Sequence, residues 1–313
     1  MRVKSVGAVA VSLLIIAGLA AGACGDSGEV TPASGSQSTT TPLPPRHISA
    51  FSAPFDLAVG ANRFSFALVD EDSRPIVDAQ VHVRFGLIGA DDTQIRSEAD
   101  AVFRGQGLED IELPISRGLW VVKVEFDSPG FWVAEVNVSE EGKPLRIASL
   151  AFEVRNESIA PAIGSPAISS ENKTLADVGD IKELTTDSDP DPDLHRISIA
   201  EALQQGRPFI VVFATPAFCE SRTCGPLVEV VKQIKEEYGD RMNYIHIEIY
   251  DDPIGLLQGS ENLTLRPAVT QWNIPTEPWV FFVDGQGIIA DRFEGFASYE
   301  ELKEAAEKLV GPS

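Results

Sequence analysis

Apolar and polar residues alternate in several short runs between residues 47 and 155. Four of these runs are rich in β-branched and aromatic residues, at 64–69, 79–85, 119–126 and 131–138. Turn-forming residues separate them, at 70–75, 86–92 and 127–130. Alternation of this kind, with a turn about every ten residues, is typical of antiparallel strands that bury one face. The pattern predicts an all-β domain over 47–155, built as a two-layer sandwich.

The region 194–313 differs because helical and extended patterns follow one another along the chain. The helices are expected at 197–204, at 226–238 before Gly239, and after the capping box Ser298–Glu301. The strands are expected at 209–213, 244–249, 279–283 and 288–293, with a turn at 284–287. A strand–helix–strand unit followed by a hairpin and a covering helix predicts an α/β domain.

Between these regions, residues 156–193 are polar and strongly acidic. The part from Glu171 to Asp193 holds eight acidic residues against two lysines and ends in alternating Asp and Pro. Charge repulsion and proline favour an extended chain, so this segment is expected to be a linker or an extended wrap.

The N-terminus has the pattern of an export signal. Arg2 and Lys4 precede a short apolar run over 6–20, and small residues lead to Cys24. This resembles a lipobox, with Ala21 where Leu is usual, and implies cleavage after residue 23 and lipid on Cys24. Residues 24–46 are rich in Gly, Ser, Thr and Pro, which is typical of a disordered tether. We expect a cell-envelope protein, lipid-anchored on the outer face of the cytoplasmic membrane.

The charge and the cysteine count narrow the function further. The chain has a formal net charge of −22, which argues against binding nucleic acid or anionic lipid through charge. Of the three cysteines, one is assigned to lipid, and the other two, Cys219 and Cys224, lie close in sequence. In an oxidising compartment this pair is expected to form a disulfide.

Two resemblances give these regions a family context. The 47–155 region resembles the small immunoglobulin-like domains of exported bacterial proteins. The run from Phe209 to Cys219, ahead of an amphipathic helix, resembles the active-site strand and loop of thioredoxin-like proteins, and Glu277-Pro278 with the following strand resembles their cis-proline segment. The second resemblance covers roughly 194–310. It implies that Pro278 is cis and packs against Cys219.

By the same resemblance, one cysteine attacks a substrate disulfide and the other resolves the mixed intermediate. Cys219 is assigned as the nucleophile because a thiol just before a helix gains from the partial positive charge of the helix N-terminus. Cys224 is then the resolving thiol. The Cys-x4-Cys spacing is two residues longer than in thioredoxins, which requires Cys219 to lie in a loop, with the helix starting near Gly225.

Besides the longer cysteine spacing, this sequence differs from thioredoxins in the proton acceptor for the resolving cysteine. Val212 occupies the place of the buried carboxylate that thioredoxins keep on their first central strand. His246 and Glu248, on the neighbouring strand, are candidates for that role. The alternative for His246 is an ordinary hydrogen-bonded sheet residue.

These observations favour a membrane-anchored, extracytoplasmic thiol-disulfide oxidoreductase. Its expected partners are thiols or disulfides of exported proteins and a redox partner of unknown identity, with no cofactor and no metal. One alternative is a redox-silent binding module in which the disulfide is structural. A copper chaperone is less favoured, because such proteins place a His in a later loop and residues 251–283 contain none. His47 and His82 are interpreted as structural or solvent-facing.

Overall fold

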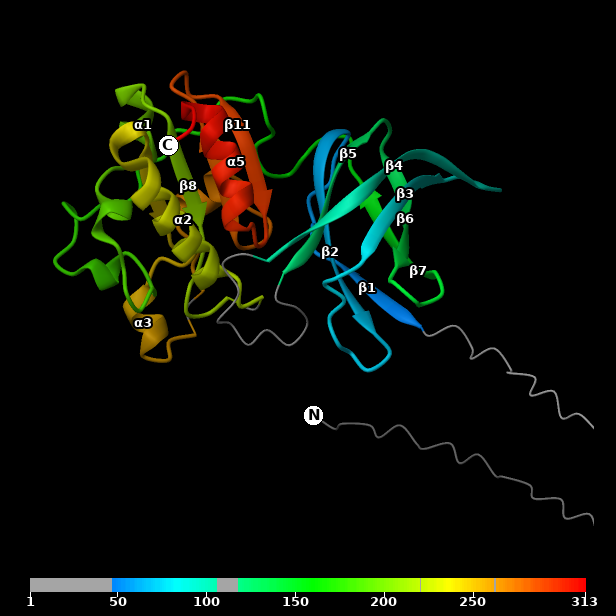
Figure 1. The fold of residues 1–313 in the computed structure, drawn as a ribbon. Coiled ribbons are helices and arrows are strands. Elements are labelled where there is room, and N and C mark those ends of the chain that lie inside the picture. Colours follow the sequence, from blue (N-terminus) through cyan, green and yellow to red (C-terminus); the bar gives the residue numbers. More distant parts are fainter. Residues whose placement is uncertain (1–46, 106–117, 220, 262) are drawn as a thin grey trace, which may run out of the picture. The chain divides into compact units, whose positions relative to one another are not determined.

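The computed structural model describes residues 47–105, 118–219, 221–261 and 263–313 (Figure 1). All of them belong to one compact unit, Leu43–Ser313. The predicted signal peptide, the tether and Cys24 lie outside the described residues. Among the helices of the described residues, none has both the length and the apolar character needed to cross a membrane.

Seven antiparallel strands form the N-terminal part of this unit. They are β1 (Ile48–Ser52), β2 (Gly60–Asp70), β3 (Gln80–Ile88), β4 (Thr93–Arg104), β5 (Leu119–Phe126), β6 (Gly130–Ser139) and β7 (Arg146–Val154). Their order in the sheet is β1-β2-β5-β4-β3-β6-β7. The predicted turn over 86–92 begins later than expected, because β3 continues through a β-bulge at Phe85/Gly86.

Strand β4 divides this sheet into two halves. Its residues 93–101 pair with β3, and its last residues, Val102 to Arg104, pair with β5. Aromatic side chains from the two halves meet in the core: the ring of Phe64 on β2 lies 5.3 Å from that of Phe85 on β3. The two halves enclose one buried core, and the first and last strands, β1 and β7, also contact each other, so the seven strands form a barrel-like sheet. The two-layer sandwich stays a prediction. The immunoglobulin-like assignment and the domain boundaries stay predictions.

The C-terminal part is built on a four-stranded sheet with the order β11-β10-β8-β9. Its strands are β8 (Phe209–Phe213), β9 (Asn243–Ile247), β10 (Trp279–Val283) and β11 (Ile289–Glu294). Strands β8 and β9 are parallel and are joined through helix α2, whereas β10 and β11 form an antiparallel hairpin beside β8. This is the order of elements that the sequence predicted.

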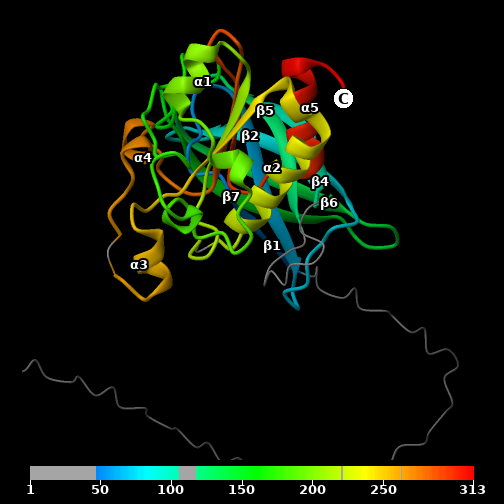
Figure 2. The same ribbon diagram turned by 90° about the vertical axis from the view of Figure 1, so that its left-hand side faces the viewer.

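Helices cover both faces of this sheet. The helices are α1 (Ile199–Gln205), α2 (Cys224–Tyr238), α3 (Pro253–Leu257), α4 (Pro267–Gln271) and α5 (Tyr299–Val310), and three short 3-10 turns are η1 (Ile181–Glu183), η2 (Pro192–His195) and η3 (Gly239–Arg241). Helices α2 and α5 share one hydrophobic cluster, and α1 and α4 share the other, on the opposite face of the strands (Figure 2). The predicted capping box at Ser298 and Glu301 opens α5.

The strands of this sheet are fully buried, as β8 illustrates. Its five residues are all buried, and successive side chains enter opposite clusters: Ile210 packs with α2, and Val211 packs with α1. Leu43–Ser313 forms a compact unit with buried hydrophobic clusters of its own, which is what a domain that folds by itself requires. We therefore expect this unit to fold without residues 1–42.

The acidic segment before α1 lies against helix α2. Lys232 Nζ contacts Asp187 Oδ2 at 2.8 Å, and Lys235 pairs with Asp191 and Asp193. Two lysines of one helix thus offset the charge repulsion that the sequence suggested. The segment also buries Leu184 and Thr186.

Candidate active site

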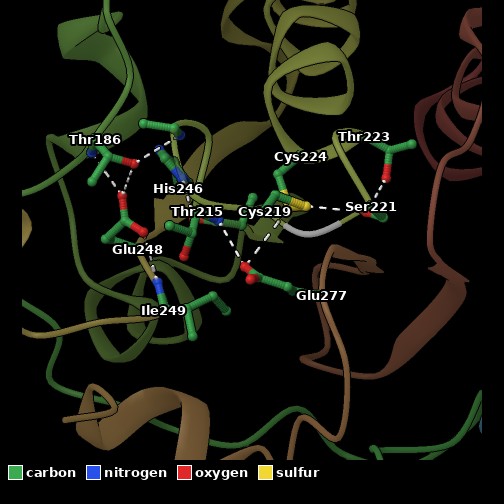
Figure 3. Close-up of a disulfide and its surroundings, with 12 residues drawn as sticks. Thr186, Thr215, Cys219, Ser221, Thr223, Cys224, His246, Glu248, Ile249 and Glu277 are labelled. Atoms are coloured by element: carbon green, nitrogen blue, oxygen red, sulfur yellow. Dashed lines mark hydrogen bonds between the residues drawn. A yellow bond between two sulfur atoms is a disulfide. The ribbon is translucent and has the colours of Figure 1, made fainter. Parts of the chain in front are cut away.

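The Cys219–Cys224 disulfide lies in the connection between β8 and α2 (Figure 3). The two Cα atoms are 5.9 Å apart, within the usual range for a disulfide. Cys219 is 8% exposed and Cys224 is fully buried. Cys219 is therefore the sulfur that a partner reaches more easily. The predicted pairing is confirmed.

The helix begins earlier than the expected start near Gly225 and Pro226, at Cys224 itself. Cys224 is therefore the cysteine at the helix N-terminus, and the helix-dipole argument that was used for Cys219 applies to Cys224. Cys219 lies in the loop, as the spacing required. Its assignment as the nucleophile now rests on its greater accessibility.

A tight turn accommodates the long spacing between the cysteines. The backbone N–H of Arg222 donates to the carbonyl oxygen of Cys219 at 3.0 Å. Arg222 has φ = 58°, in the left-handed region that non-glycine residues seldom adopt. The turn reverses the chain between the two sulfurs, so that they meet although they are not neighbours on one helix.

Two hydroxyl groups, those of Thr223 and Ser221, form a hydrogen-bonded chain that ends at the Cys219 sulfur. Ser221 Oγ lies 3.1 Å from Cys219 Sγ, and Thr223 Oγ1 lies 2.8 Å from Ser221 Oγ. Once the disulfide is reduced, Ser221 could donate a hydrogen bond to the Cys219 thiolate. A hydrogen bond to the charged form favours that form.

The peptide bond between Glu277 and Pro278 is cis, as the thioredoxin-like resemblance implied. The Glu277 side chain reaches the disulfide: its Oε2 lies 3.7 Å from Cys224 Sγ and accepts the backbone N–H of Thr215 at 3.0 Å. Glu277 was not among the site residues predicted from the sequence. Its position just before the expected cis-proline was the available signal.

His246 lies under the loop and has a partner of its own. It is directly opposite Val212 in the register of β9 and β8, and its Nε2 lies 3.1 Å from the carbonyl oxygen of Ala214. Burial lowers its pKa to about 4, so the ring is neutral at physiological pH. This geometry fits the alternative of a hydrogen-bonded sheet residue.

Glu248 is fully buried and is held by Thr186. Its Oε2 accepts the backbone N–H of Thr186 at 2.7 Å and the Thr186 hydroxyl at 2.9 Å. Burial raises the pKa of Glu248, and hydrogen bonds from neighbouring threonines oppose the rise. Thr186 Oγ1 also accepts the backbone N–H of Ala217 in the cysteine loop at 3.2 Å. Glu248 therefore anchors the loop through Thr186, and the carboxylate that lies against the sulfurs is that of Glu277.

Comparison with known proteins leaves the family open. No family model matches the chain, and no curated protein matches it. One similar solved structure is the soluble domain of PmoD from a Methylocystis species, at 17% identity and a TM-score of 0.22, covering 35% of this chain and 90% of that one. Another is a thiol:disulfide interchange protein of the thioredoxin family from Chlorobium tepidum, at 16% identity and a TM-score of 0.32, covering 49% of this chain and 100% of that one. Likeness at this level does not fix the function.

Proposed function

We propose that this chain is an extracytoplasmic thiol-disulfide oxidoreductase, anchored by lipid on Cys24, that exchanges disulfides through Cys219 and Cys224. The observation that carries the proposal is the disulfide at the start of α2, with Cys219 the more exposed of its two cysteines and the Glu277 carboxylate against Cys224. The partners would be thiols or disulfides of exported proteins.

The reducing direction illustrates the chemistry. The Cys219 thiolate attacks one sulfur of a substrate disulfide, forms a mixed disulfide and releases the other substrate sulfur as a thiolate. Cys224 then passes its proton to Glu277 and attacks the Cys219 sulfur, which releases the second substrate thiolate. The protein dithiol loses two electrons and the substrate disulfide gains them. The oxidising direction is the reverse.

The acceptor role belongs to Glu277 in this proposal because of its position. Its carboxylate is within hydrogen-bonding reach of the Cys224 sulfur, and the Thr215 N–H holds it there. His246 and Glu248 are each engaged beneath the loop by other groups.

A second candidate function is a binding module in which the disulfide is a structural staple. The observation that favours it is burial, since one sulfur is inaccessible and the other is nearly so. A staple resists reduction while the domain is folded.

The reduction potential of the pair separates the two candidates. The Leu43–Ser313 unit would be equilibrated in glutathione redox buffers and its thiols trapped, with Cys219→Ser as the control. A potential between about −120 and −270 mV with rapid exchange supports the oxidoreductase. A potential below about −300 mV, or a pair inert in the folded protein, makes the disulfide a staple and overturns the proposal.

A further inference from the structure

Three groups with metal-binding atoms meet at the disulfide. One sulfur from each of Cys219 and Cys224 and a carboxylate oxygen of Glu277 all lie within 4.8 Å of one another. Across the described residues, this is the one group of three or more His, Cys, Asp or Glu side chains so closely placed. We propose that the dithiol form of this site binds one Zn²⁺ ion through Cys219, Cys224 and Glu277. The inference rests on one part of the proposed function, the reducibility of the pair.

The three donors come from separate segments, and each is positioned by the fold. Cys224 is the first residue of α2, Cys219 lies at the turn before it, and Glu277 precedes the cis-proline at the start of β10. The N–H of Thr215 fixes the direction of the Glu277 carboxylate. A carboxylate oriented by a second group in this way is what a metal ligand requires.

The donor types fit zinc. Thiolate sulfur and carboxylate oxygen are both ordinary ligands of Zn²⁺, and three protein ligands leave a fourth tetrahedral position open for water or another donor. The partial exposure of Cys219 gives that open position a route to the solvent.

Charge is a second reason to expect a metal ion at this site. Two thiolates and one carboxylate would place three negative charges in a partly buried site, where like charges disfavour one another. A divalent cation reduces the net charge to −1. Without a metal, the reduced sulfurs relieve the same repulsion by staying protonated.

Metal binding is therefore coupled to the redox state. In the disulfide the two sulfurs are bonded to each other and neither is a thiolate. A phosphine supplies two electrons and becomes the phosphine oxide, and water supplies that oxygen and two protons, so that the S–S bond is replaced by two thiols. Zn²⁺ then displaces the two thiol protons, which leave to solvent, and the released sulfurs can move apart to the separation that a common metal requires.

The test is a zinc titration of the Leu43–Ser313 unit, which lacks Cys24, in competition with a chromogenic chelator. The phosphine-reduced protein is expected to bind one Zn²⁺ per chain, and the oxidised protein none. Cobalt in place of zinc should give the absorption of a thiolate-ligated ion. Failure of the reduced protein to compete for zinc, or equal binding by the oxidised protein, overturns the inference.

Variants establish which side chains are ligands. Glu277→Gln should weaken zinc binding at least tenfold, and Cys219→Ser or Cys224→Ser should weaken it more. Glu236→Gln is the matched control, because Glu236 is an exposed carboxylate on α2 and its loss should leave the affinity unchanged. Unchanged affinity in Glu277→Gln would show that the carboxylate is not a ligand and would overturn the three-ligand site.

Exchange assays run in the presence of chelator keep the two proposals apart. Rapid exchange by a protein that does not bind zinc would overturn the metal-site proposal and leave the oxidoreductase proposal standing. If the pair is inert while folded, the oxidoreductase proposal fails. The titration is then repeated on protein refolded in the reduced state, where stoichiometric zinc supports the metal site and no zinc overturns it.

Discussion

Glu277 and Glu248 occupy two polar clusters around the same cysteine loop, and they do different things there. Glu277 is partly exposed, accepts the backbone N–H of Thr215 and lies against Cys224. Glu248 is fully buried, and its carboxylate accepts both the N–H and the hydroxyl of Thr186. A carboxylate whose hydrogen-bonding capacity is taken up by the fold serves stability, whereas one aimed at a sulfur can serve chemistry.

The largest effect is expected from the cysteines themselves. Cys219→Ser should abolish disulfide exchange, with a loss of at least about 1000-fold, because it removes the attacking sulfur. Cys224→Ser should leave Cys219 able to form a mixed disulfide that is not resolved. Trapping with a chromogenic aromatic disulfide, followed by mass measurement, distinguishes the two. If Cys224 is the residue that traps the substrate, the assignment of nucleophile and resolving thiol is reversed.

The paired substitutions Glu277→Gln and Glu248→Gln test the comparison directly. Glu277→Gln should slow the resolving step roughly 10- to 100-fold, because a positioned proton acceptor is lost. Glu248→Gln should change that rate by less than about threefold, since its role is structural. Stopped-flow measurement of mixed-disulfide decay gives both rates, in the presence of chelator. The opposite ranking would make the acceptor Glu248, one of the two candidates, with His246, that the sequence suggested.

Acidification should destabilise the protein through the buried histidines beneath the cysteine loop, His246 above all. Burial lowers the pKa of His246 from 6.5 to about 4, and the nearby charges of Arg266 and Lys232 also lower it, while the hydrogen bond to Ala214 and the charge of Asp187 raise it. The unfolded state therefore takes up a proton first as pH falls. The stabilising contribution is complete above pH 6.5 and is lost as pH falls towards 4.

For His246 alone, the free energy of unfolding should fall by about 1.5 kcal/mol between pH 6.5 and pH 5. Burial lowers the pKa of the neighbouring His195 in the same direction, which adds to the effect. Urea denaturation at the two pH values measures it, and His246→Gln should flatten the dependence. If that variant does not fold, His195→Gln provides the same comparison. An unchanged slope in the folded variant would contradict the assignment.

The smallest effect is expected at Thr186, whose hydroxyl joins the loop to Glu248. Thr186→Val keeps the shape but removes both side-chain hydrogen bonds, so it should lower the free energy of unfolding by about 1 to 2 kcal/mol. Thr223→Val is the control. The Thr223 hydroxyl contacts Ser221 at an exposed position, so its loss should lower the free energy of unfolding by less than about 0.5 kcal/mol. Equal losses in the two variants would show that Glu248 does not depend on Thr186.

Much of the C-terminal architecture could be predicted because its signals are local. The strands 209–213 and 279–283 were placed correctly from unbroken apolar runs, and Gly239 marks the end of α2 as expected. The strands β1, β4 and β7 were missed. In β4, most side chains are exposed or half-buried, so the apolar alternation that reveals a strand is weak. The short helices α3 and α4 lay within what was expected to be a loop.

The main strands and helices of the C-terminal part, the spacing of the cysteine pair and the candidate cis-proline could be predicted from the sequence, because each depends on neighbouring residues. Only the tertiary structure decided which carboxylate faces the sulfurs. His246, Glu248 and Glu277 are all polar residues near strand ends, and the direction of a side chain depends on the register of β8, β9 and β10 and on which hydrogen-bonding groups have already been taken. Thr186, about thirty residues before the loop, is the clearest case: its contact with Ala217 exists because the acidic segment folds back onto α2.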